Sequence, residues 1–131
     1  MESKKVLIVK DLVKNYQQSN DCVQVLNSLT FSVERGERVS IMGSSGSGKT
    51  TLLNLLGGLD DLNEGTIHVC SKSWSELSVS ERATWRNKHV GFVYQFHHLL
   101  EEFSAAENVA LPLMIAGQSR EISLQEASGF L

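Results

Sequence analysis

The sequence has little of what marks secreted or nucleic-acid-binding proteins. Among its 131 residues are only two cysteines, Cys22 and Cys70, which lie far apart and outside any C-x-x-C pattern. Such an arrangement indicates reduced structural thiols. The net charge of −3 gives no support for a nucleic-acid partner, which usually requires a basic face. We therefore expect no nucleic acid among the partners.

Long apolar runs are absent as well. The longest, residues 109–116, contains the only proline, Pro112, and falls short of the roughly 18 residues of a membrane span. The apolar stretch at residues 6–9 is too short for a signal peptide, so we expect an intracellular chain. With 41% hydrophobic and 21% charged residues, the composition is that of a soluble globular protein, and residues 1–131 suit one small domain.

What stands out is a glycine-rich segment. It reads Gly43-Ser44-Ser45-Gly46-Ser47-Gly48-Lys49-Thr50 and matches the pattern G-x-x-x-x-G-K-[ST]. Glycines let the backbone wrap closely around phosphate, and successive N–H groups then point at the anion. Lys49 supplies a positive charge to the β- and γ-phosphates, and the Thr50 hydroxyl suits Mg²⁺. The segment therefore predicts a site for a nucleoside triphosphate with Mg²⁺.

The flanking segments have the pattern that this motif requires. Residues 37–42 are predicted to form a short buried strand, and residues 51–56 a helix closed by Gly57 and Gly58. The start of that helix would add roughly half a positive charge beside the phosphates. A flexible Gly/Ser linker is the alternative, but a linker would not be flanked so tightly by two apolar elements.

The rest of the chain alternates strand-like and helix-like segments. Residues 6–16 are predicted to form a strand, 17–21 a polar turn, and 23–33 one or two further strands. Later strands are predicted at residues 66–69 and 90–94. Helices are predicted near Ser80, with Ser78 or Ser80 as N-cap, at Ser104, which has capping-box spacing to Glu107, and from Ser123. A strand-rich layer before the glycine loop distinguishes this arrangement from many phosphate-loop enzymes.

With these motifs, residues 6–117 resemble the ATP-binding subunits of ABC transporters. Besides the glycine loop, which corresponds to their Walker A motif, Tyr16 occupies the place of an aromatic residue that stacks on adenine. The run Val90-Gly91-Phe92-Val93-Tyr94-Gln95 resembles the strand that leads into their Q-loop. The resemblance implies an α/β fold, the P-loop NTPase core of an ABC-type nucleotide-binding domain with an N-terminal β-rich layer. Its loop-bearing strand would be paired on both sides.

The resemblance also implies ATP and Mg²⁺ as cofactors. The residues implied in binding them are Tyr16, Gly43, Ser44, Ser45, Gly46, Ser47, Gly48, Lys49, Thr50, Thr51 and Gln95. Of these, Thr50 and Gln95 would contact the metal. Integral membrane transporter subunits, contacted through the Q-loop region, and a second ATPase subunit in a homodimer are the implied partners.

Two further stretches narrow the resemblance. Residues 55–60, and the Phe-His-His-Leu-Leu run at 96–100, are similar to the ATPase subunits of bacterial lipoprotein-releasing systems. This implies a peripheral protein at the cytoplasmic face of the inner membrane that energises lipoprotein release. ATPases of macrolide-type exporters and cell-division complexes share much of the rest and remain alternatives.

The sequence departs from the family pattern at its end. It contains no L-S-G-G-Q signature, Walker B strand, D-loop or switch histidine. We therefore expect residues 1–131 to be the N-terminal part of such a domain, ending within its helical subdomain, with no catalytic residue inside the chain. A nucleotide-binding module without hydrolysis is a further alternative. A P-loop kinase or GTPase is a distant one, because no guanine-reading N-K-x-D motif is present.

Overall fold

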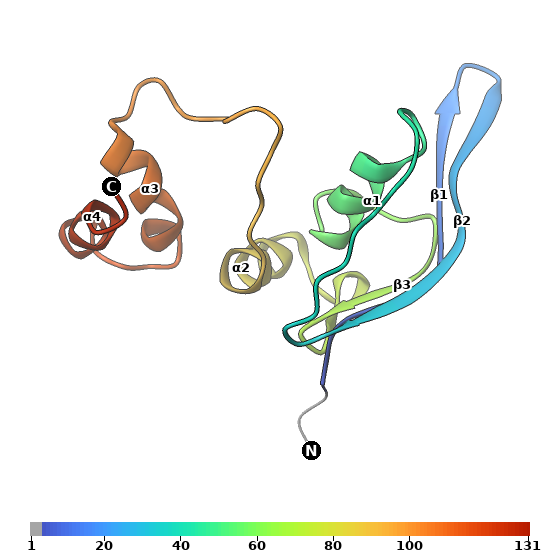
Figure 1. Cartoon of the computed structure of the whole chain (residues 1–131), viewed down its shortest axis with the longest axis horizontal. Coiled ribbons are helices and arrows are strands. Elements are labelled where there is room, and N and C mark those ends of the chain that lie inside the picture. The colour runs from blue at the N-terminus through green and yellow to red at the C-terminus, as the bar shows by residue number, and fades with distance from the viewer. Residues whose placement is uncertain (1–3) are drawn as a thin grey trace. The chain divides into compact units, whose positions relative to one another are not determined.

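The computed structural model describes residues 4–131, which divide into two compact units. The first unit extends to Arg82 and contains the strands, which appear in blue to yellow-green in Figure 1. The second runs from Ala83 to Leu131 and is helical. The glycine loop belongs to the first unit.

An antiparallel sheet with the strand order β2-β1-β3-β4 forms the base of the first unit. Its strands are β1 (Lys5–Gln18), β2 (Asp21–Glu34), β3 (Glu64–Val69) and β4 (Lys72–Ser73). The turn between β1 and β2 lies at Ser19 and Asn20. The predicted strands at residues 6–16 and 66–69 are confirmed, and residues 23–33 belong to a single strand. The predicted turn is shorter than expected, because Gln17, Gln18 and Asp21 belong to the strands. The two-residue β4 is too short for a periodic pattern to predict.

The long hairpin of β1 and β2 is irregular. Lys14 lies opposite Leu26, whereas the next residue, Asn15, lies opposite Gln24. Val25 is therefore the extra residue of a β-bulge. A bulge bends its strand and changes the direction of a side chain, which is a common device beside functional sites.

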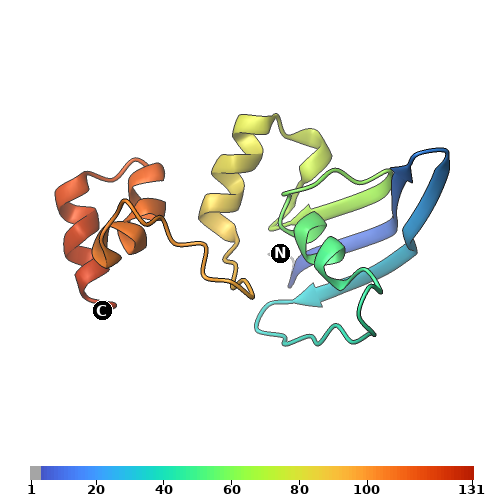
Figure 2. The same cartoon turned by 90° about the horizontal axis from the view of Figure 1, so that it is seen from above.

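Helix α1 (Lys49–Leu56) lies over one face of the sheet (Figures 1 and 2). Its Leu52 and Leu55 are buried, as are Val9, Leu12 and Ile67 of the strands beneath. Burying an aliphatic side chain contributes about 1.5–3 kcal/mol, so this shared core holds the helix on the sheet. The predicted helix is confirmed and begins two residues earlier than expected.

After β4, the chain forms a short 3₁₀ turn, η1 (Trp74–Glu76), and then α2 (Val79–His89). Trp74 is buried, and its indole N–H donates to the carbonyl of Leu56 at the end of α1, at 3.0 Å. Ser78 caps α2, because its hydroxyl accepts from the Glu81 N–H while its own N–H donates to the Glu81 carboxylate. Of the two candidate caps, the structure therefore selects Ser78.

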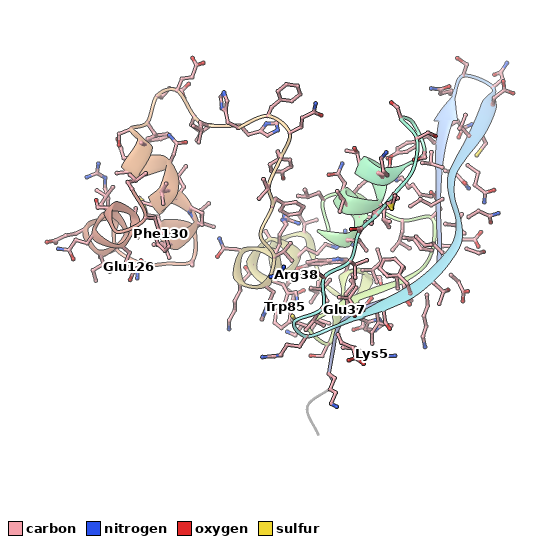
Figure 3. All side chains as sticks on the ribbon, viewed as in Figure 1. Lys5, Glu37, Arg38, Trp85, Glu126 and Phe130 are labelled. Carbon is pink, nitrogen blue, oxygen red and sulfur yellow. The ribbon has the colours of Figure 1, made fainter. Side chains whose placement is uncertain are left out.

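The prediction of a buried strand at residues 37–42 is wrong. This segment is an irregular connection between β2 and the glycine loop, and the side chains of Glu37 and Arg38 within it are labelled in Figure 3. Val39 is 53% exposed and Met42 is 91% exposed. A strand requires a neighbour that accepts and donates its backbone hydrogen bonds. Within residues 4–131, no strand pairs with this segment.

The prediction of a strand at residues 90–94 is also wrong. Between His89 and Ala105 the chain forms neither helix nor strand, and Val93 is fully exposed. The apolar run that suggested a strand has no partner in the described sheet. Two ring contacts give the segment local order: Phe92 stacks on Tyr94 at 5.5 Å, and Tyr94 meets His98 edge-on at 4.7 Å between centroids.

Two helices of the second unit, α3 (Ala105–Ile115) and α4 (Arg120–Ser128), pack against each other. Ala110 and Ala127 are fully buried. The predicted capping box of Ser104 and Glu107 at α3 is confirmed. Helix α4 begins three residues before the predicted Ser123. None of the helices within residues 4–131 combines the length and the hydropathy of a membrane-spanning segment.

Candidate functional site

The glycine loop leads directly into α1 and leaves the start of that helix open. Gly46 and Gly48 have φ angles of 79° and 94°, which side chains rarely allow. Gly48 is the N-cap of α1 and offers no side chain to the first turn, which also contains no acidic residue. The first N–H groups of a helix have no intrahelical acceptor. The start of α1 therefore presents unused donors and a partial positive charge, the combination that binds phosphate.

The glycine loop packs against the bulge of β2. A Cβ at Gly48 would lie 2.8 Å from Cγ1 of Val25 and 3.3 Å from its carbonyl oxygen. Only glycine combines this close approach with a positive φ. Val25 was not among the residues predicted from the sequence, because a loosely alternating strand gives no sign of which residue bulges.

Together, these elements surround an open hollow of about 470 Å³. Its lining consists of Val25, Ser45, Gly46, Gly48, Lys49, Thr50 and Thr51. All of them except Val25 were predicted as nucleotide-binding residues. Sites for small molecules typically measure about 300–1,000 Å³, so the hollow has the size of a ligand site.

Lys49 brings a positive charge to the lining of this hollow. Its ammonium group donates to the backbone carbonyl of Gly43 and to that of Ser44, the latter at 3.3 Å. Both partners are neutral, and within residues 4–131 no carboxylate forms an ion pair with Lys49. The backbone thus holds the ammonium group at the loop while its charge remains available to an anion.

Thr50 is exposed in the first turn of α1 and lines the same hollow. Its hydroxyl is an oxygen ligand of the kind that Mg²⁺ accepts beside substrate phosphates. The residues present therefore fit a phosphate-bound Mg²⁺.

Tyr16 lies near the end of β1 and is 40% exposed. Its hydroxyl donates to Oδ2 of Asp60 at 2.9 Å, and the ammonium of Lys14 lies 4.8 Å from the ring centroid. Burial raises the pKa of Asp60, but the hydrogen bonds from Tyr16, the Asp61 N–H and Lys14, together with the charge of Lys14, hold that pKa below its usual value. Asp60 is therefore ionised and acts as an acceptor near neutral pH.

The sequence did not indicate the roles of Lys14 and Asp60. Tyr16 and Asp60 are 44 positions apart, and no motif connects them. The side chain of Lys14 is buried, which is unusual for lysine and gives no signal in a sequence pattern.

Gln95 is exposed and lies in the irregular segment of the second unit. The glycine loop belongs to the first unit, so the predicted contact between Gln95 and Mg²⁺ stays a prediction. The exposed residues that follow it in the sequence include three large apolar ones, Phe96, Leu99 and Leu100.

The sequence is similar to those of known proteins. The profile described as ABC transporter matches residues 26–129. The lipoprotein-releasing system ATP-binding protein LolD of Chromohalobacter salexigens is 52% identical over 116 residues, which cover 88% of this chain and 49% of that protein. LolD of Pseudomonas syringae pv. tomato is 47% identical over 131 residues, covering the whole chain and 58% of that protein. The chain thus spans about half the length of the curated relatives it matches.

Solved structures agree with the sequence relatives. The dimeric ATP-binding cassette MJ0796, in a post-hydrolysis state bound to ADP and Pi, matches with a TM-score of 0.86 at 33% identity. The match covers 94% of this chain and 54% of that chain. A second dimeric structure of the same bacterial ABC transporter cassette gives a TM-score of 0.84 at 34% identity. The expected ABC-type fold is therefore confirmed, and the chain belongs to the ABC transporter family.

Proposed function

We propose that this chain binds MgATP as part of an ABC transporter ATP-binding subunit that energises lipoprotein release from the bacterial inner membrane. The observation that carries the proposal is the hollow in which Lys49 and the uncapped start of α1 meet the glycine loop. A polyanion fits such a site far better than a neutral ligand does. The similarity to LolD proteins supports the specific system.

Each part of the site has a distinct task in this proposal. The N–H groups of the loop and of the first turn of α1 bind the phosphates, and Lys49 adds a charge-assisted hydrogen bond. Thr50 holds Mg²⁺, which neutralises charge on the phosphates. The ring of Tyr16 stacks on adenine, an interaction worth about 1–3 kcal/mol for a nucleic-acid base on an aromatic side chain.

Binding is the part of the reaction that residues 1–131 can carry out. Their motifs include no Walker B carboxylate to orient an attacking water. We therefore assign MgATP binding to this chain, and assign hydrolysis and lipoprotein release to its assembly with a second ATPase subunit and the membrane subunits.

The segment around Gln95 is the surface that we propose for the membrane subunits. Exposed Phe96, Leu99 and Leu100 give it an apolar character. Large apolar side chains grouped on a surface mark interaction sites. This assembly would hold the chain at the cytoplasmic face of the membrane as a peripheral subunit.

Replacing Lys49 tests the phosphate site directly. We expect Lys49→Ala to weaken MgATP binding, measured by titration calorimetry, by at least about tenfold, because a hydrogen bond to a charged group contributes about 1.5–3 kcal/mol. The matched control is Lys10→Ala, which removes an exposed lysine of β1 outside the hollow and should leave the affinity unchanged. Equal affinity in wild type and Lys49→Ala would contradict the proposal.

The transported substrate needs a separate experiment. A complete subunit that carries this sequence, reconstituted with lipoprotein-releasing membrane subunits, should release lipoprotein from membranes when ATP is supplied, and its Lys49→Ala variant should not. Activity only with macrolide-exporter membrane subunits would favour the alternative system while leaving the MgATP site intact.

A further inference from the structure

Three side chains form a compact cluster in the first unit, which also contains the glycine loop. The hydroxyl of Tyr16 donates to Oδ2 of Asp60, and the ammonium of Lys14 lies 3.2 Å from Oδ1 of the same carboxylate. The same ammonium lies over the Tyr16 ring, 4.8 Å from its centroid. Two residues of β1 are thereby joined to one residue that follows α1.

The bond between Tyr16 and Asp60 is not needed to attach β1 to the connection that leads to β3. The connection is already held by the Asn63 N–H, which donates to the carbonyl of Val13 at 3.0 Å. The Asn63 side chain also accepts from the Asn15 N–H at 2.7 Å, and Lys14 donates to the carbonyl of Asp61. Because these bonds fix the connection without Tyr16, the bond from the Tyr16 hydroxyl to Asp60 mainly determines the direction of the ring.

The Tyr16 ring is held at two points and remains partly exposed. Lys14 covers one face through a cation–π contact, and Asp60 holds the hydroxyl at the edge. Tyr16 nevertheless remains 40% exposed. A ring held at two points loses little rotational freedom on binding, which is the general advantage of preorganisation.

The fold also connects the ring to the phosphate site through two short paths. Tyr16 pairs with Val23 across the hairpin, and Val23 is two residues from Val25 in the wall of the hollow. Asp60 lies just beyond α1, whose eight residues rise about 12 Å from the phosphate-binding end. One short helix therefore links the phosphate site to the residue that holds the ring.

We propose that Asp60 is a positioning residue for base selectivity: together with Lys14, it holds the Tyr16 ring so that the face away from Lys14 accepts the purine of the bound nucleotide. This inference rests on the proposed MgATP site in the hollow. Asp60 itself does not touch the base and acts only through Tyr16.

The test compares a ligand that has a base with one that lacks it. Affinities for MgATP and for Mg-tripolyphosphate are measured by calorimetry on the full chain, as wild type, Asp60→Ala, Tyr16→Phe and the double variant. We expect each single variant to lower the preference for ATP by roughly three- to tenfold, the effect of one net hydrogen bond, with tripolyphosphate affinity unchanged. The double variant should lose no more than Asp60→Ala alone, because Tyr16→Phe removes a bond that Asp60→Ala has already removed.

The matched control is Asp61→Ala. The Asp61 carboxylate pairs with Arg82 at 2.7 Å and does not contact Tyr16, so the preference for ATP should remain that of the wild type. An equal loss of ATP and tripolyphosphate affinity in Asp60→Ala would show a purely structural role and overturn the inference. A loss of ATP preference in the double variant equal to the sum of the two single losses would also overturn it. If Asp60→Ala does not fold, Tyr16→Phe removes the same bond and decides the question.

Failure of this inference is distinguishable from failure of the proposed function. If the wild type binds tripolyphosphate as tightly as ATP, the phosphate site stands and the ring does not select the base. If the wild type binds neither ligand, the MgATP site falls, and the role of Asp60 falls with it.

Discussion

At the scale of single residues, the site depends on a contact between Val25 and Gly48. The loop can approach β2 only because Gly48 has no Cβ, and Val25 faces it only because the hairpin bulges there. The motif identifies Gly48, since it lies at a fixed position before Lys49. Nothing in the local sequence identifies Val25, because the register of two paired strands decides which residue bulges.

Two glycine substitutions separate backbone strain from steric conflict at this contact. Gly36 has a φ of 80° and no heavy atom within 4 Å of an added Cβ, whereas a Cβ at Gly48 would clash with Val25. We expect Gly36→Ala to lower the free energy of unfolding by about 1–2 kcal/mol, the cost of a left-handed alanine. Gly48→Ala should lower it by about 1–3 kcal/mol more, the usual cost of overpacking. Urea unfolding monitored by tryptophan fluorescence measures both.

A third substitution checks the cause of that difference. Val25→Ala removes Cγ1, so it should recover part of the additional loss in Gly48→Ala. It should recover nothing in Gly36→Ala, which has no contact with Val25. Equal destabilisation by Gly36→Ala and Gly48→Ala would show that Val25 does not press on the loop.

At the scale of elements, prediction succeeded where the determinants are local. The hairpin, α1 and the capping box of α3 follow from alternation, a glycine motif and the spacing of Ser104 to Glu107. It failed at residues 37–42 and 90–94, because an apolar run specifies burial in general and does not supply a hydrogen-bonded neighbour. It also missed the early start of α4, where Ser119 accepts from the Ile122 N–H and caps the helix.

Asn108 shows how one helix organises an irregular segment. From α3, its side-chain oxygen accepts from the Leu100 N–H at 2.9 Å, and its amide donates to the carbonyls of Leu100, Phe103 and Ser104. Asn108 therefore closes the end of the segment that precedes α3. Helix α3 could be predicted from the sequence, whereas the conformation of the segment that Asn108 binds could not.

We expect Asn108→Ala to accelerate hydrogen exchange at the Leu100 amide by about five- to tenfold, the effect of one net hydrogen bond. Exchange followed by mass spectrometry or NMR measures this change. Asn87→Ala is the matched control, because the Asn87 amide donates to the carbonyl of Pro112 and not to this segment. If the exchange of Leu100 is the same in both variants, Asn108 does not hold the segment in solution.

At the scale of the whole molecule, buried side chains and regular backbone hydrogen bonds are unevenly distributed along the chain. The largest fully buried side chains of the described residues lie mostly in β1, α1 and β3, as with Val9, Leu12, Leu55 and Ile67. By contrast, the segments at residues 37–42 and 90–104 have no regular hydrogen bonding and expose large apolar side chains. Segments with few buried contacts open at the lowest free energy. The backbone of the two irregular segments should therefore be the first to become accessible to a protease.

Limited proteolysis tests this distribution with two enzymes that cut at different residues. Chymotrypsin should cut first after Tyr94 or Phe96, which are exposed and lie outside any strand, before it cuts after Tyr16 in the paired β1. Trypsin finds no lysine or arginine at residues 90–104 and should instead cut early after Arg38. A protease needs several residues of extended, unpaired backbone, which both segments supply. Intact mass identifies the fragments. Early cleavage within β1 would contradict the described structure of these segments. Resistance of Arg38 to trypsin would contradict it as well, because a buried strand would resist cleavage.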